Sequence, residues 1–150
     1  MNNYFSTIAF AALCALSMTS AVAQSNAMEP ARLAPEELKW TLSPTGTHRA
    51  VLAGDEKKAG MYAYRARFPA NFRNQPHFHP DDRMATVLSG TLLVGFGEKF
   101  DEARMKALTA GGVWTEPAGQ PHYVWAKDGE VVIQIIGVGP SAMTLVDPKR

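Results

Sequence analysis

Residues 74–84 read NQPHFHPDDRM, the most informative stretch of the sequence. His77 and His79 are two residues apart, so on a β-strand, where side chains alternate, both imidazoles point to the same face. A third histidine, His122, lies in GGVWTEPAGQPHYVW (residues 111–125), where a Pro-x-Gly turn places it at the start of another strand. Three neutral imidazoles that meet in a cavity suit a divalent first-row metal. The fourth histidine, His48, is expected to be structural or at the surface.

The rest of the chain predicts an all-β fold. Short runs rich in β-branched and aromatic residues are separated by glycine and proline, as in sandwiches and barrels. A tight turn at Ser89-Gly90 is expected to join two of these strands. Residues 100–108 contain good helix formers, so one or two helical turns are expected there. The clearest runs are MYAYRARF (61–68), ATVLSG (85–90), TLLVGFG (91–97), HYVWA (122–126) and EVVIQIIGVG (130–139).

The two histidine segments, taken together, resemble the two motifs of the cupin superfamily, in its small members with an HPDDR-type first motif. The resemblance covers residues 40–146. It implies an antiparallel jelly-roll barrel of six to eight strands, a homodimer, and one metal near the barrel axis held by His77, His79 and His122. The positions that match are His77, His79 and Gly90 in the first motif, and Gly111, Pro117, Gly119 and His122 in the second.

One position departs from the family pattern. In many cupins a glutamate completes the metal set, and by spacing its place falls on Arg83, or less well on Met84. Three alternatives follow. The three histidines suffice with water and substrate; Asp81 or Asp82 moves in as a carboxylate ligand; or the metal has been lost and the histidines bind a ligand directly. Pro80 interrupts strand pairing, so the direction of the following side chains is open.

Three further charged residues have two interpretations each. Arg83 either binds an anionic substrate beside the metal or, as we prefer, turns away and pairs with Asp81 or Asp82. Arg65 is a second candidate for holding an anion if its face of the strand points inward, although an outward face is more frequent. Glu116 is a candidate general base if it faces the barrel, but an exposed position is expected for an isolated glutamate.

The chain has 150 residues, a formal net charge of +1 and no basic or acidic block, so neither nucleic acid nor an anionic membrane is indicated as a partner. Residues 8–18 form a short apolar run, followed by Ala-Val-Ala at 21–23, which predicts a signal peptide over 1–23 and a periplasmic or secreted protein. Residues 24–37 are expected to be an arm or linker, and 38–150 the cupin domain. Cys14 is the only cysteine, so removal of the leader leaves no thiol.

Two functions fit these observations. The first is a metal-dependent enzyme, of dioxygenase, isomerase or decarboxylase type, that acts on a small organic substrate, with anionic ones included. Its cofactor would be Fe, Mn, Ni or Zn. No Ser-His-Asp arrangement, thiol or phosphate-binding loop favours hydrolytic or nucleotide-dependent chemistry. The second is a non-catalytic module that binds or senses a small ligand or a metal.

Overall fold

The computed structural model describes residues 28–146. The expected signal peptide, with Cys14, lies outside the described residues, as does the C-terminal segment 147–150. The described part of the expected arm is mostly exposed and contains a single 3-10 turn, η1 (Pro35–Glu37). Among residues 28–146, no helix combines the length and apolar character that a membrane span requires.

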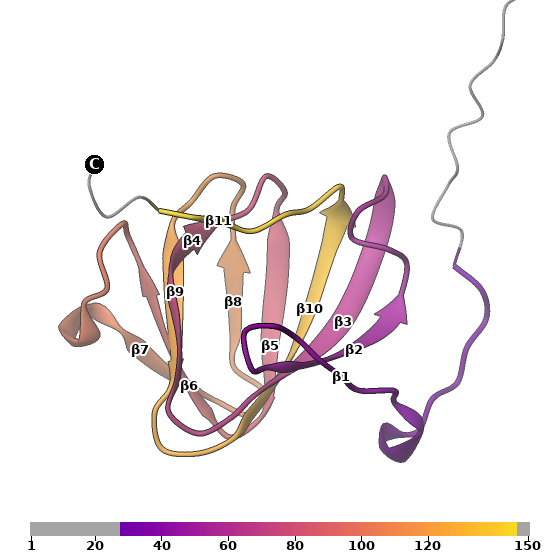
Figure 1. The fold of residues 1–150 in the computed structure, drawn as a ribbon, viewed down its shortest axis with the longest axis horizontal. Helices are drawn as coiled ribbons and strands as arrows, with labels where there is room; N and C mark the ends of the chain where they lie inside the picture. The colour runs from indigo at the N-terminus through magenta and orange to yellow at the C-terminus, as the bar shows by residue number, and fades with distance from the viewer. Residues whose placement is uncertain (1–27, 147–150) are drawn as a thin grey trace, which may run out of the picture.

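The fold is a jelly-roll of two antiparallel sheets that face each other (Figure 1), which confirms the all-β prediction. One sheet, sheet A, has the strand order β1-β2-β3-β10-β5-β8, and the other, sheet B, has the order β11-β4-β9-β6-β7. No ladder joins the two sheets among the described strands, so the barrel is not closed by hydrogen bonds. The strands are β1 (Thr41–Leu42), β2 (His48–Ala53), β3 (Gly60–Phe68), β4 (Phe72–Phe78), β5 (Arg83–Ser89), β6 (Thr91–Phe96), β7 (Lys106–Thr109), β8 (Val113–Glu116), β9 (His122–Ala126), β10 (Val131–Gly139) and β11 (Thr144–Leu145).

The core lies between the two sheets and follows from the alternation along each strand. On β10, every second residue from Val131 is buried and those between are partly or fully exposed. Tyr62, Val87, Leu92 and Ile133, from four strands on both sheets, are at most 1% exposed and meet in one cluster. Burial of one such side chain contributes about 1.5–3 kcal/mol, so this cluster holds the two sheets together.

Gly90 makes a corner between the sheets. The expected tight turn is present, since β5 ends at Ser89, β6 starts at Thr91 and Gly90 has φ +78°. However, β5 pairs with β10 and β8 in sheet A, whereas β6 pairs with β7 and β9 in sheet B. A Cβ at Gly90 would collide with the backbone oxygen of Glu130, so this corner requires glycine.

The segment expected to be helical is only partly so. A single 3-10 turn, η2 (Glu102–Arg104), is capped by the Asp101 side chain, which accepts a hydrogen bond from the backbone N–H of Ala103. The residues after it form β7, which pairs with β6 at the edge of sheet B. Tertiary pairing therefore overrides the local helix propensity of Lys106–Thr109.

Candidate metal centre

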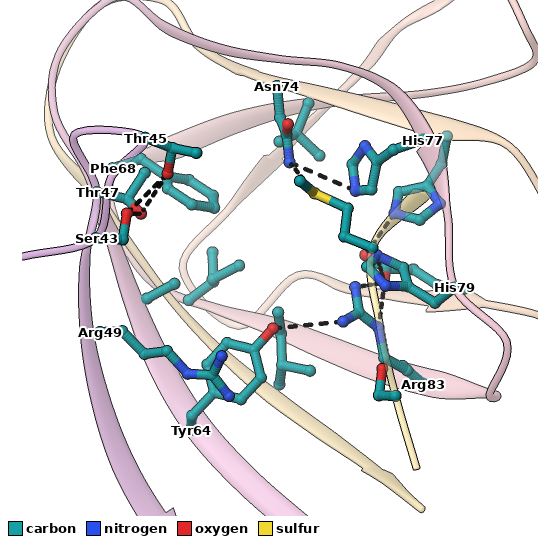
Figure 2. A pocket seen from close by; sticks show the side chains of 18 of the residues that line it. Ser43, Thr45, Thr47, Arg49, Tyr64, Phe68, Asn74, His77, His79 and Arg83 are labelled. Carbon is teal, nitrogen blue, oxygen red and sulfur yellow. Dashed lines mark hydrogen bonds and ion pairs between the residues drawn. The ribbon is translucent and has the colours of Figure 1, made fainter. Parts of the chain in front are cut away.

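The three histidines of the two motifs converge at one end of the fold. His77 is near the end of β4 and His122 is the first residue of β9, and the two are direct cross-strand partners. His79 follows β4 directly and shares the face of His77. All three are at most 5% exposed, and one ring nitrogen of each lies within 4.8 Å of those of the other two. The convergence predicted from the sequence is therefore present, and Figure 2 shows His77 and His79 on the same side of the cavity.

Backbone carbonyls fix which nitrogen of each imidazole faces the centre. Nδ1 lies 2.7 Å from the carbonyl oxygen of Gln75 in His77, 2.7 Å from that of Ala142 in His79, and 3.1 Å from that of Gln120 in His122. A carbonyl oxygen only accepts, so each Nδ1 carries the hydrogen and donates it. In a neutral imidazole, Nε2 then keeps its lone pair, which is the arrangement of a metal-ligating histidine.

The protonation of two histidines suits metal binding. Burial, with the nearby His122, lowers the pKa of His77 to about 4, and burial, with the Arg83 guanidinium, lowers the pKa of His79 to about 4. Both rings are therefore neutral at pH 7. The Nε2 atoms of His79 and His122 are buried and lack a hydrogen-bond partner within residues 28–146. Because unpaired buried polar atoms are costly, these two atoms point to a bound group.

A carboxylate does lie beside the histidines, and it belongs to Glu116. This residue ends β8, is 3% exposed, and has Oε1 3.2 Å from Nε2 of His122 and Oε2 4.0 Å from Nε2 of His79. The expectation of an exposed Glu116 is therefore wrong. The sequence carried a signal for it: Glu116 is two residues after Trp114, which is also buried, so both side chains point inward from β8.

Arg83 also faces the interior, which corrects the preferred expectation that it pairs with Asp81 or Asp82. It opens β5 directly opposite Glu116 on β8, and its Nε donates to Glu116 Oε2 at 2.8 Å, with a second, short bond from Nη2. Its Nη1 donates to the Tyr64 hydroxyl at 3.4 Å. Burial opposes ionisation of Glu116, but a proton on Nε2 of His122, when that ring carries one, and the Arg83 guanidinium outweigh it and hold the pKa of this carboxyl well below its usual range.

The two aspartates of the HPDDR segment are used elsewhere. Asp81 is buried and accepts a hydrogen bond from the Tyr62 hydroxyl at 2.6 Å. Asp82 is exposed and accepts one from the backbone N–H of Ala118 at 2.8 Å, which ties together the loops that carry the two motifs. Neither belongs to the convergent donor group, and the carboxylate beside the histidines comes from a different strand.

Arg65, the second candidate for holding an anion, and His48, expected to be structural or at the surface, both lie outside the cavity. Arg65 is on the face of β3 opposite to the buried Tyr64, and its Nε donates to Gln134 at 3.2 Å. His48, at the start of β2, is half-buried and is not one of the lining residues. We therefore leave Arg65 out of the proposed site.

The histidines border a cavity of about 260 Å³ between the sheets, slightly below the usual range of small-molecule pockets, about 300–1,000 Å³. Figure 2 shows the hydroxyls of Ser43, Thr45 and Thr47 across this cavity from His77 and His79. These hydroxyls lie 2.7–3.3 Å from one another. Phe68, Phe72, Val124, Ile133 and Ile135 are among the apolar lining residues. A second arginine of the lining, Arg49, is held by two hydrogen bonds to Glu56, at 2.6 and 2.7 Å.

A family model described as Cupin matches residues 53–146. Similar solved structures include the polyketide cyclase RemF from Streptomyces resistomycificus, with TM-score 0.67 and 16% identity over 79% of this chain and 87% of that chain. A sugar phosphate isomerase from Silicibacter pomeroyi has TM-score 0.61 and 14% identity over 78% and 82%. An oxalate oxidase in complex with glycolate has TM-score 0.54 and 23% identity over 69% and 57%. At these identities the likeness concerns the fold alone. No curated protein matches the chain in sequence.

Proposed function

The chain belongs to the cupin family, and on that premise we propose that it is a metal-dependent enzyme acting on a small organic substrate. One observation carries the proposal: three buried imidazoles point their Nε2 atoms at a common centre while their Nδ1 atoms are tied to backbone carbonyls. Two ligand atoms that are each about 2.1 Å from a tetrahedral ion lie about 3.4 Å apart, so donor atoms within 4.8 Å of one another need to approach by at most about 1.4 Å.

His77, His79 and His122 would hold one divalent ion, Fe, Mn, Ni or Zn, since imidazole suits all four. Bound there, the ion would supply Lewis acidity or activate oxygen, which is compatible with dioxygenase, isomerase or decarboxylase chemistry. The protein would contribute orientation and the exclusion of water, because the ligands are buried and the rest of the cavity is largely apolar.

Charge favours an anionic substrate. Arg83 is neutralised by Glu116 and Arg49 by Glu56, so the charge of a divalent ion would remain unbalanced in a buried cavity. A carboxylate or enolate bound to the ion would balance it, and the hydroxyls of the β1–β2 turn are placed to bind polar groups at the other end of the substrate. The guanidinium of Arg83, occupied by Glu116, is not needed as the anion site.

The experiment begins with elemental analysis of the purified protein. Reconstitution with Fe(II), Mn(II), Ni(II) or Zn(II) is followed by thermal unfolding, because binding to the folded state alone raises stability with metal concentration. The reconstituted protein is then incubated with a panel of small acids and phenols, and oxygen uptake and product formation are measured. His77→Ala and His122→Ala should abolish the metal-dependent stabilisation, and His48→Ala is the control. Stoichiometric metal with no turnover favours the non-catalytic binding module. No metal in any sample refutes the metal-dependent enzyme and leaves only a module that binds a small ligand directly.

Export and dimerisation are part of the proposal. The signal-peptide pattern predicted from the sequence of residues 1–23 supports a periplasmic or secreted protein, which cell fractionation and N-terminal sequencing of the purified protein test. Three exposed apolar side chains on neighbouring strands of sheet A, Met61, Met84 and Val138, support a homodimer through the outer face of that sheet. Sedimentation of the wild type and of Met84→Lys tests this, with a monomeric wild type as the contradicting result.

A further inference from the structure

Glu116 has an arrangement that a simple salt bridge to Arg83 does not explain. Oε2 receives both hydrogen bonds from Arg83, so the ion pair uses only one of the two carboxylate oxygens. Oε1 accepts a hydrogen bond from Trp114 Nε1 at 2.9 Å and faces Nε2 of His122 at 3.2 Å. The second oxygen is thus held against the histidine cluster by its own donor.

The contact between Glu116 and His122 brings two acceptors together. His122 donates through Nδ1 to the carbonyl of Gln120, so Nε2 of the neutral ring presents a lone pair to a carboxylate oxygen. Two acceptors at this distance repel unless a proton or a cation lies between them. Two ligand atoms at a right angle on one ion, each about 2.1 Å from it, are about 3.0 Å apart, which is close to the 3.2 Å observed.

The cross-strand register explains how the carboxylate reaches this place. Arg83 on β5 and Glu116 on β8 are directly paired, so their side chains leave neighbouring strands at the same level and on the same inner face. A carboxylate on β8 can therefore reach the space that one on β5 would occupy. Arg83, in turn, is long enough to bind the far oxygen of that carboxylate.

We propose that Glu116 is the fourth protein ligand of the metal centre, supplied by β8, and that Arg83 is a positioning residue that holds its outer oxygen. This inference rests on the proposed metal function and adds the carboxylate that the first motif lacks. Trp114 would fix the inner oxygen from the same strand. The ligand set then becomes three imidazoles and one carboxylate, although Arg83 stands at the position where the first motif places a glutamate.

The test measures metal binding without turnover. Co(II) and Mn(II) are titrated into wild type, Glu116→Gln and Asp82→Asn by calorimetry, and the visible spectrum of bound Co(II) reports the ligand set. Glu116→Gln should weaken binding at least about tenfold and change the Co(II) spectrum, because the amide is a poorer ligand and can instead donate to His122. Asp82→Asn removes the charge of an exposed carboxylate and should match the wild type.

A swapped variant, Arg83→Glu with Glu116→Arg, keeps the buried pair and moves the carboxylate to β5. It should bind Co(II) more tightly than Glu116→Gln, which a purely structural role of the pair does not predict. A second test uses the wild type alone and so does not depend on whether any variant folds. Its infrared carboxylate bands should shift when Zn(II) is added. Unchanged affinity and spectrum in Glu116→Gln, with binding still lost in His77→Ala, overturn this inference and leave the proposed function standing. A wild type that binds no metal overturns both.

Discussion

Replacement of Arg83 by methionine should strongly destabilise the metal-free protein, because it leaves the Glu116 carboxylate buried without its cation. Arg83 is 7% and Glu116 3% exposed, and removal of one partner of such a pair costs about 3–5 kcal/mol. Protonation of Glu116 limits this loss, because the folded variant can take up a proton instead of keeping the charge buried. From an ordinary pKa of 4.5, protonation of the carboxyl at pH 7 costs about 3.4 kcal/mol at about 1.36 kcal/mol per unit. We therefore expect a loss of about 3 kcal/mol.

The pH dependence tests the cause of this loss. In the wild type the pKa of Glu116 is lowered, so its stabilising contribution is present above pH 4.5 and is lost as the pH falls toward the lowered value. In Arg83→Met the unpaired carboxyl has a raised pKa and takes up a proton on folding. The stability difference between the two proteins should therefore shrink as the pH falls from 7 toward 4.5, by up to about 1.4 kcal/mol per unit.

The assay is urea unfolding in the presence of a chelator, with the double variant Arg83→Met/Glu116→Gln as the matched control. The double variant has no charge at positions 83 and 116, and its amide oxygen can still accept from Trp114, so it should recover most of the loss. A single-variant loss below about 1 kcal/mol at pH 7 would refute the reasoning, as would a loss that does not change with pH.

Three other predictions concern stability and use the same unfolding assay. Tyr62→Phe leaves a carboxylate oxygen of buried Asp81 without its donor and should cost about 1–3 kcal/mol; a neutral result would mean that water replaces the hydroxyl. Gly95→Ala places a Cβ against the ring of buried Tyr123 and should cost about 1–3 kcal/mol, whereas Gly129→Ala, which meets open space, should have little effect; equal effects contradict the packing argument. The metal-free wild type should lose stability as the pH falls from 6.5 to about 4. The folded state lowers the pKa of both histidines of the first motif to about 4, so in this range the unfolded state takes up protons that the folded state does not, and their contribution to folding stability is complete only above pH 6.5. A stability that does not change over this pH range contradicts this.

The histidine cluster was predictable because a local rule places two of its members together and the resemblance to the cupin motifs adds the third. The period of a strand puts His77 and His79 on one face, and the second motif places His122 at a strand start. The same period also predicts the orientation of Arg83, since Arg83, Ala85 and Val87 are every second residue of β5 and all three are buried. That signal was obscured by Pro80, after which the phase of the strand could not be counted from the histidines.

The pairing of strands was not predictable in the same way. Nothing in residues 85–97 says that the strands on the two sides of Gly90 belong to different sheets, because that choice depends on pairing with β10 and β9, whose partner residues are at least 26 positions away. The helix propensity around Lys106 was similarly overridden by pairing with β6. The contact between Arg83 and Glu116 joins residues 33 positions apart and depends on the same long-range pairing.

The register between β5 and β8 also bears on how related chains are sorted. A search for the family's metal set that reads one motif at a time sees an arginine in place of a glutamate here and classes the chain as defective. Read across the ladder, the two paired positions of this chain hold an arginine on β5 and a glutamate on β8. Related sequences with an arginine at the first position are therefore better grouped by whether an acid stands before the Pro-x-Gly turn than by the first motif alone.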